Sequence, residues 1–410
     1  VKYENAIAPA PWTLPSHVSM VTGLYPSHHG VYERIHASNN DLAEISRKQL
    51  ENLNHGIIGI LMDEGYNIYM LSANPYLSPY FGFNKYTVSI VTGFNSYEVI
   101  KSINQYEDIK YLYELNHKYG YLGAIKYLID SKKFDLLYLD VRIFLQKRIR
   151  RLIMSMKRVA AEAGLIDLTM DKGASMIIRL LRNSKLNEPF LLLINIMEAH
   201  SPYLPKDLKD DVYINAIMDW IFNRRVSSSM INELRFRYGI YAKHAIYKAI
   251  NIIYTLSRYI DNTLFIITSD HGELLGDGGL GHGYFLKDGL LRVLFWVRWP
   301  NWFKAPKQVN TFISLTEIPS MIRAVINNDE DYKVGTSMAI AESFGLTPNH
   351  RVDVRSLNTD KLIELFSHRI RVYTGRCILT YNENMDVVEE SSCQESTAKK
   401  IAETVKSLLN

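Results

Sequence analysis

The chain has 410 residues, of which 47% are hydrophobic and 22% charged. This globular composition excludes wholesale disorder, and the length predicts two or three domains or one large α/β domain with an appendage. Because 47 basic and 43 acidic side chains leave a net charge of only +4, we expect a mild preference for anionic ligands and no nucleic-acid partner. No run of about 18 apolar residues is present, which predicts no membrane span.

The two cysteines, Cys377 and Cys393, lie outside any Cys-x-x-Cys or Cys/His cluster. The sequence therefore predicts neither a zinc knuckle nor a redox motif. They could pair across a hairpin, but we favour free thiols in a reducing compartment. The chain also opens without a basic-then-apolar signal, so we expect a cytoplasmic protein.

Residues 1–10 are expected to be extended, and prolines interrupt the segment that leads to Thr13. From Ser16 the apolar residues recur with a helical spacing, until Gly23 and Pro26 end the pattern. Thr13 is therefore expected in the turn before a helix N-terminus, where backbone N–H groups favour a bound anion. Alternatively, Thr13 or Ser16 only caps the helix.

Alternating helix and strand signals follow and predict an α/β fold. A helical pattern over residues 50–65 precedes the first of four expected buried strands, which cover residues 66–72, 187–197, 264–268 and 290–299. Residues 95–185 have a mostly helical period, and we assign no chemistry to them. Their basic cluster at 147–158 is interpreted as a solvated helix face.

From about Arg351 the sequence changes to short alternating segments, the first over residues 351–356, and we place a subdomain boundary near Thr347-Pro348. The pattern predicts a small antiparallel sheet carrying a terminal helix from Ser396. We therefore expect a catalytic α/β domain over residues 1–347, with 95–185 as a divergent helical region, and a C-terminal α+β subdomain over residues 348–410.

Polar residues follow the expected strand at 264–268. Asp270 supplies a carboxylate and His271 an imidazole, a combination suited to a divalent cation. The glycines after them permit positive φ and allow His282 to fold back toward the same point. A simple turn after a strand is the alternative interpretation.

Three polar clusters thus lie at strand ends or at a helix start: Thr13, His200, and Asp270-His271 with His282. Together they describe a site in which a cation lowers the pKa of a coordinated hydroxyl and imidazoles bind an oxyanion ester. Such a site requires a nucleophile, and Thr13 is the hydroxyl in the anion-binding position.

These motifs resemble a known family. Residues 13–26, TLPSHVSMVTGLYP, are similar to the signature of the sulfatase family in the alkaline phosphatase superfamily, and residues 268–273, TSDHGE, and 198–203, EAHSPY, resemble two further motifs in the family's order. The resemblance covers about three quarters of the chain. It implies an alkaline phosphatase-like layered α/β sandwich with a mostly parallel central sheet.

The resemblance also implies roles for individual residues. Asp270 and His271, with the Thr13 hydroxyl, match ligands of one divalent metal ion, which we expect to be Ca, Mg, Mn or Zn. Thr13 stands at the nucleophile position, while His200 and His282 match residues that contact the sulfate or phosphate oxygens and assist the leaving group. The substrate implied is a small-molecule, glycan-linked or lipid-linked phosphate or sulfate ester.

The departures from the family pattern shift the expected chemistry. True sulfatases convert a Cys or Ser to formylglycine, which Thr13 cannot become, so the resemblance favours phosphodiesterase or phosphotransferase chemistry. His17 replaces the arginine that usually follows, which makes one positive partner pH-dependent. Ile196 stands where two-zinc members carry an aspartate, so one metal ion is expected.

The family's first strand, which ends in acidic ligands, has no counterpart before Val1. We favour the interpretation that the sequence is truncated over natural loss of this strand. The second candidate function is a non-catalytic relative that keeps the fold and binds an anionic glycan or a protein partner.

Overall fold

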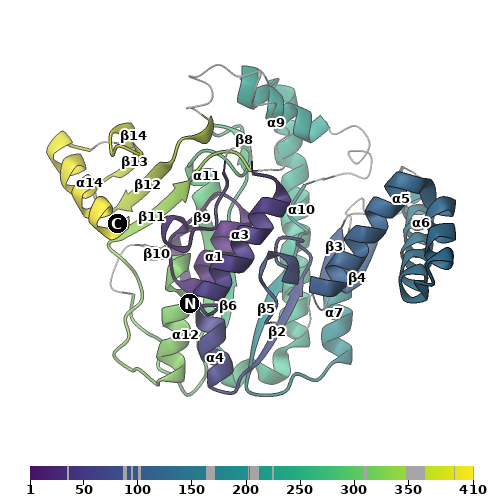
Figure 1. The fold of residues 1–410 in the computed structure, drawn as a ribbon. Helices are drawn as coiled ribbons and strands as arrows, with labels where there is room; N and C mark the ends of the chain where they lie inside the picture. Colours follow the sequence, from purple (N-terminus) through teal and green to yellow (C-terminus); the bar gives the residue numbers. More distant parts are fainter. Residues whose placement is uncertain are drawn as a thin grey trace. The chain divides into compact units, whose positions relative to one another are not determined.

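The computed structural model describes residues 1–34, 37–85, 90–93, 96–99, 103–162, 171–201, 203, 212–223, 226–308, 312–347, 365–391 and 393–409 (Figure 1). The chain divides into two compact units. Unit 1 consists of Val1–Ile60, Asn215–Ile231 and Leu256–Asn410, and unit 2 of Leu61–Ile214 and Asn232–Thr255.

A four-stranded mixed sheet forms the centre of unit 1. Its strand order is β10 (Ile313–Ser314), β1 (Lys2–Ile7), β9 (Arg292–Arg298) and β6 (Phe265–Thr268). β1 runs parallel to β10, whereas β9 is antiparallel to both β1 and β6. Since β1 and β6 both oppose β9, they run in the same direction and their carboxyl ends reach the same edge of the sheet.

The antiparallel strand β9 is the departure from the mostly parallel sheet that the family resemblance implied. Its burial alternates, with Val293, Phe295 and Val297 buried and Leu294 and Trp296 exposed. Alternation of this kind is typical of a strand with one face against the core. The buried side chains pack in one cluster with Tyr3, Ile313 and Met321, among others.

Several helices and short strands belong wholly or partly to unit 1. The helices are α1 (Thr13–Thr22), α2 (Pro26–His29), α3 (Asn39–Asn52), α4 (Ile57–Asp63), α9 (Val212–Asn223), α11 (Asp288–Leu291) and α12 (Ile318–Ile326). Two short strands, β7 (Leu274–Leu275) and β8 (Leu280–Gly281), form a hairpin.

The helix expected over residues 50–65 is broken. α3 ends at Asn52, and Asn54, His55 and Gly56 all adopt positive φ before α4 begins. At Gly56 the chain passes so close to Val21 that a Cβ atom would collide with its carbonyl oxygen. The segment between α3 and α4 therefore packs against the end of α1. Helical periodicity in the sequence does not reveal such a break.

A second, antiparallel sheet contains β11 (Met338–Ser343), β12 (Arg369–Thr374), β13 (Ile378–Asn382) and β14 (Val387–Ser391), with α14 (Glu395–Leu409) packed on it. The predicted small sheet and terminal helix are present, and the sheet also includes β11, which precedes residue 348. The expected segment 351–356 and Pro348 lie outside the described residues.

Cys377 and Cys393 form a disulfide, with Cα atoms 5.3 Å apart, so the expectation of free thiols is wrong. Cys377 directly precedes β13, and Cys393 lies two residues before α14. The packing of α14 on the sheet brings the two residues within the Cα separation that a disulfide requires.

Unit 2 contains a parallel pair of strands, β2 (Asn67–Ser72) and β5 (Phe190–Asn195), in continuous register from Asn67↔Phe190 to Ser72↔Asn195. Both strands were predicted from apolar runs. A short hairpin of β3 (Ile90–Gly93) and β4 (Ser96–Val99) and the helices α7 (Ala174–Asn183) and α10 (Ser228–Thr255, of which 232–255 lie in this unit) complete its core elements.

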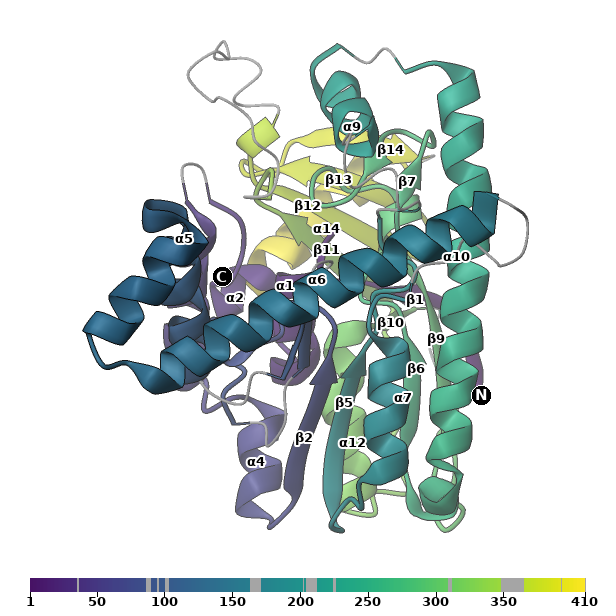
Figure 2. The ribbon, with the colours of Figure 1, turned by 90° about the vertical axis from the view of Figure 1, so that its right-hand side faces the viewer.

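The divergent middle region forms a helical hairpin, α5 (Ile103–Asp130) and α6 (Phe134–Glu162) (Figure 2). The two helices pack through an apolar cluster that includes Leu112, Leu128 and Ile143. The mostly helical period of this segment is therefore confirmed for its described part. Within the described residues, no helix is both long and apolar enough to span a membrane.

His29, at the end of α2, is buried and held neutral by its hydrogen bonds. Its Nδ1 accepts the N–H of Val31 at 3.1 Å, so Nε2 carries the proton and lies 3.0 Å from Ser19 Oγ. Burial lowers the pKa of His29 to about 3, although a hydrogen bond to the Pro15 backbone partly opposes the shift. Protonation would place a second N–H against the Val31 donor.

We predict that His29 makes stability fall in acid. Because its folded pKa lies below the unfolded value of about 6.5, its contribution is complete above pH ~6.5 and is lost as the pH falls toward 3. His29→Gln should therefore lose less stability between pH 7 and pH 5, by up to about 1.4 kcal/mol per pH unit below the unfolded pKa. Urea unfolding at each pH measures this, and identical pH slopes for the two proteins would refute it.

Candidate active site

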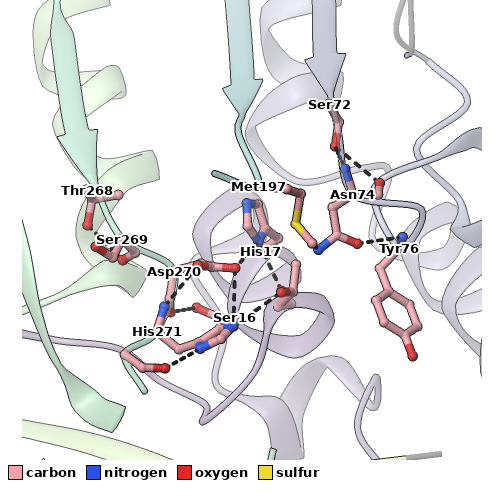
Figure 3. Close-up of polar contacts among 12 residues, drawn as sticks. Ser16, His17, Ser72, Asn74, Tyr76, Met197, Thr268, Ser269, Asp270 and His271 are labelled. Atoms are coloured by element: carbon pink, nitrogen blue, oxygen red, sulfur yellow. Dashed lines mark hydrogen bonds and ion pairs between the residues drawn. The ribbon is translucent and has the colours of Figure 1, made fainter. Parts of the chain in front are cut away.

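The N-terminus of α1 and the loop after β6 meet at one edge of the unit 1 sheet. Thr13 is the first residue of α1, and Trp12 before it is extended. The Ser16 hydroxyl donates to the Asp270 carbonyl at 2.6 Å, although the two residues are 254 positions apart. Figure 3 shows Ser16, His17, Asp270 and His271 gathered here. The sheet thus brings together two of the predicted clusters.

The imidazole of His271 presents a lone pair to the Thr13 hydroxyl. Its Nδ1 lies 2.8 Å from the carbonyl oxygen of Gly272, so Nδ1 carries the proton and donates. Nε2 is then the acceptor, 3.3 Å from Thr13 Oγ1. Burial lowers the pKa of His271, against the attraction of Asp270, which keeps the ring neutral near pH 7.

Asp270 supplies the negative charge of this cluster. Its Oδ1 accepts the backbone N–H of His271 at 3.1 Å, and its Oδ2 lies 3.7 Å from His271 Nε2 and 3.5 Å from His17 Nδ1. Burial alone would raise the pKa of Asp270, but the attraction of His271 and His17 and a hydrogen bond from Thr13 lower it below its usual value. The carboxylate is therefore ionised at neutral pH.

His17, which stands where the family usually has arginine, is turned inward. Its Nδ1 lies 3.0 Å from the carbonyl oxygen of Thr13, one turn earlier on α1. Nδ1 therefore carries a proton and donates it in this hydrogen bond. Burial lowers the pKa of His17, although Asp270 and the Thr13 carbonyl oppose the shift. At neutral pH it therefore contributes a neutral N–H donor here.

His282 folds back toward His271, as the glycine-rich loop predicts. The two rings lie 4.7 Å apart at 35°. Glu273 Oε2 is 2.8 Å from His282 Nδ1. Burial by itself would lower the pKa of His282, but the charge and hydrogen bond of Glu273 outweigh it and raise that pKa. The N–H of Gly283 also donates to the Pro11 carbonyl at 3.0 Å, which ties this loop to the start of α1.

The sequence did not reveal the pairing of Glu273 with His282, since a hairpin of two very short strands separates the two residues. Glu273 was noted only as part of the motif after Asp270. Its pairing with His282 follows from the fold, because β7 and β8 pair Leu274 with Gly281 and so align the residues that flank the hairpin.

Thr13 Oγ1, Asp270 Oδ2 and His271 Nε2 converge at one point, and a hydroxyl, a carboxylate and an imidazole suit a divalent cation. Such a cation takes at least four ligands. In the part of the chain that the structure describes, no group of three or more His, Cys, Asp or Glu side chains could hold a metal ion. These residues therefore furnish only part of a coordination shell.

His200 belongs to unit 2, where it follows β5. Its Nδ1 lies 2.6 Å from the carbonyl oxygen of Ser201. Beneath this turn, the ammonium of Lys172 donates to the carbonyl oxygens of Glu198 and His200 and lies 4.3 Å from the Tyr241 ring centroid. The role of His200 at the Thr13 site stays a prediction.

Lys172 was not predicted, because it lies in the segment to which we assigned no chemistry. Glu198 Oε1 accepts backbone N–H groups of Lys172 and Ala174 at 3.0 and 2.9 Å, where α7 begins. Burial lowers the pKa of Lys172 to about 7, although Glu198 opposes the shift. The signal that could have indicated Lys172 is Glu198, because a buried glutamate needs a polar or charged partner.

A polar turn also follows β2 in unit 2. Asn74 is buried there, and its Oδ1 accepts the N–H of Tyr76 at 2.9 Å while its Nδ2 contacts the Met197 sulfur at 3.4 Å (Figure 3). The carboxyl ends of β2 and β5 thus place Asn74 and Met197 in direct contact. Strand ends of a parallel pair are where α/β folds place ligand-binding groups.

Comparisons with known proteins agree with the fold and the motifs. The family model described as Sulfatase matches residues 1–325, so the chain belongs to the sulfatase family. An arylsulfatase from Clostridium perfringens is 25% identical over 177 residues, which are 37% of this chain and 36% of the relative. The match thus spans about a third of that relative's length.

Solved structures show the same fold at low identity. A 2-O GAG sulfatase superimposes with a TM-score of 0.56 and 12% identity, covering all of this chain and 83% of the other. A phosphonate monoester hydrolase from Silicibacter pomeroyi gives a TM-score of 0.51 and 12% identity over all of this chain and 87% of the other. These likenesses confirm the predicted α/β fold class.

We predict that Gly272→Ala disrupts the loop that carries His271. A Cβ atom at Gly272 would collide with the carbonyl oxygen of Gly289, and the Gly272 N–H bonds to Leu290 at 2.7 Å. The substitution should destabilise the protein by about 2 kcal/mol or more in denaturant unfolding. Gly239→Ala is the matched control, since its Cβ meets nothing within 4 Å on α10 and alanine favours helix by about 1 kcal/mol. Equal effects would contradict the prediction.

Proposed function

We propose that this member of the sulfatase family is a metal-dependent hydrolase or transferase of a phosphate ester, with Thr13 as its nucleophile. The observation that carries the proposal is the position of Thr13 Oγ1 at the first residue of α1, 3.3 Å from the unprotonated Nε2 of His271. A hydroxyl at a helix N-terminus is directed toward the position that an anionic ester group favours.

The identity of the nucleophile favours phosphate over sulfate. Formylglycine is an aldehyde, which can be made only from a primary side-chain carbon such as that of Cys or Ser. Thr13 carries a methyl group on the same carbon, so oxidation would give a ketone. Sulfate release by collapse of a hemiacetal is then unavailable, whereas direct attack by a hydroxyl on phosphorus needs no modification. The phosphodiesterase or phosphotransferase preference rests on this argument.

Thr13, Asp270 and His271 are the residues that would hold the divalent cation. When bound, the cation would lower the pKa of a coordinated hydroxyl and offset negative charge on the ester. Asp270 suits this role because its carboxylate is ionised, and His271 because its tautomer is fixed by Gly272. Ca, Mg, Mn and Zn all remain candidates for the ion.

The remaining steps are assigned to side chains of the chain itself. Thr13 gives up its hydroxyl proton to solvent, and its Oγ1 forms a bond to phosphorus as the bond to the leaving oxygen breaks. His282, held by Glu273 at 2.8 Å, is proposed to donate a proton to that oxygen, and His200 to bind the non-bridging oxygens. Water, or an acceptor alcohol in a transferase, then takes the phosphoryl group from Thr13.

A non-catalytic relative that binds an anionic glycan or a protein partner is the second candidate. It is favoured by one observation, the incomplete metal coordination among the described residues. A protein of this kind would keep the fold and the anion-attracting end of α1 but would show no turnover and bind no stoichiometric cation.

We expect Thr13→Ala to abolish activity. With aryl phosphodiester, phosphate monoester and sulfate substrates in the presence of Mn, Mg, Ca or Zn, kcat should fall about 10³-fold or more, because the attacking atom is missing. Thr13→Ser restores the hydroxyl and should retain a measurable part of the rate. Thr22→Ala serves as control, since it removes a hydroxyl that donates to the Val18 carbonyl on α1 and accepts the Leu24 N–H. Unchanged turnover in Thr13→Ala would eliminate the proposed nucleophile.

Elemental analysis tests the cation independently of turnover. After dialysis against each metal, the wild-type chain should retain about one equivalent of one of them, while Asp270→Asn should retain much less because the ligand loses its charge. Asp261→Asn, at an exposed ion pair with Arg298, is the matched control. If the wild-type chain retains none of the four metals, the metal-dependent proposal fails and the non-catalytic alternative gains support.

A further inference from the structure

One face of α6 exposes large apolar side chains. The exposed members are Phe134 (61%), Tyr138 (71%), Leu145 (51%), Ile149 (58%), Leu152 (63%) and Met156 (65%). Their separations of 4, 7, 4, 3 and 4 positions place all six within a sector of about 60° on a helix with 3.6 residues per turn. We refer to these six residues as the α6 stripe.

The α6 stripe is distinct from the face that α6 uses within unit 2. Ile143 is buried against Leu112 and Leu128 of α5, and Leu136 and Leu139 pack against the same cluster. In Figure 2, α6 continues well beyond the part that lies beside α5. The α6 stripe is therefore apolar surface that the packing against α5 does not use. Single exposed apolar residues are ordinary on protein surfaces, but a continuous row of six is not.

Positive charge is concentrated around the α6 stripe. Residues 141–158 contain seven basic side chains and no acidic one. Subtracting these seven charges from the net +4 of the whole chain leaves −3. The basic character of the protein thus resides in one helix segment, in which Arg148 is exposed and lies about 100° around the helix from Ile149.

A second helix of the same unit has the same character. α10 exposes Phe236, Ile240, Tyr247, Ile250 and Tyr254, which also recur at helical spacing. Between residues 232 and 255 it carries four basic side chains and one acidic, Glu233. Two helices of unit 2 therefore combine exposed aromatic and aliphatic residues with excess positive charge.

We propose that the α6 stripe lies on an anionic lipid bilayer. A helix with an apolar face and a lysine- and arginine-rich polar face binds in the plane of the membrane interface, with its apolar side chains between the headgroups. Pairing with a second copy would place seven like charges opposite seven others. A nucleic acid would use the charge but leave the six apolar side chains in water. This inference is independent of the chemistry proposed for Thr13.

Vesicle flotation tests this proposal with the full chain. Vesicles of phosphatidylcholine alone and vesicles containing phosphatidylglycerol are compared at low salt and at about 1 M salt, where the Debye length is only ~3 Å. The wild-type chain should float with the anionic vesicles at low salt, bind neutral vesicles at least about tenfold less, and be largely released by salt.

Two sets of variants separate the two contributions. Leu145→Ser, Ile149→Ser and Leu152→Ser together remove apolar area, and Arg148→Gln, Arg150→Gln and Arg151→Gln together remove charge. Each triple variant should bind anionic vesicles at least about tenfold more weakly, with an unchanged far-ultraviolet circular dichroism spectrum. The control combines Trp302→Ser, Val388→Ser and Leu408→Ser, which are exposed apolar residues of unit 1, and should bind like wild type.

Three results would overturn the proposal. The first is no flotation of the wild-type chain with anionic vesicles. The second is equal weakening by the unit 1 control, which would indicate nonspecific adsorption. The third is a dimer in light scattering that the Leu145, Ile149 and Leu152 variant dissociates, which would make a second copy the occupant of the α6 stripe.

Discussion

The candidate site depends on the contact between the start of α1 and the loop after β6. β1 and β6 flank the antiparallel β9 and run in the same direction, so the segments that follow them emerge at one edge of the sheet. The hydrogen bond from Ser16 to the Asp270 carbonyl, 2.6 Å long, fixes the two segments together. This contact holds Thr13 Oγ1 within 3.3 Å of His271 Nε2.

Burial and charge then set the protonation states around this contact. The ionised carboxylate of Asp270 lies beside imidazoles that burial keeps neutral. Glu273, in contrast, raises the pKa of His282. As a result, the Thr13 hydroxyl lies at a helix N-terminus beside the unprotonated Nε2 of His271. The more basic imidazole of His282 lies 4.7 Å from the His271 ring. This arrangement gives neighbouring histidines different chemical properties through their hydrogen-bond partners.

Much of this could be predicted from the sequence, because short-range patterns determine it. The apolar run at 264–268, the polar residues after it and the glycines before His282 were sufficient to predict the strand, the cluster and the return of the loop. The antiparallel β9, the break at Asn54–Gly56 and the Cys377–Cys393 disulfide were not predictable, since each depends on which segments pack together. Lys172 and Glu273 were missed for the same reason, as the partner of each, Glu198 and His282 respectively, is brought near only by the fold.

The most direct test of the account is the chemical state of Thr13 during reaction. Rapid quenching with an aryl phosphate ester, followed by mass spectrometry of the peptide that contains Thr13, should show an unmodified threonine before reaction and a phosphoryl group on its hydroxyl at early times. A quenched enzyme that turns over substrate but never carries a phosphoryl group on Thr13, or carries it on another residue, would contradict the account.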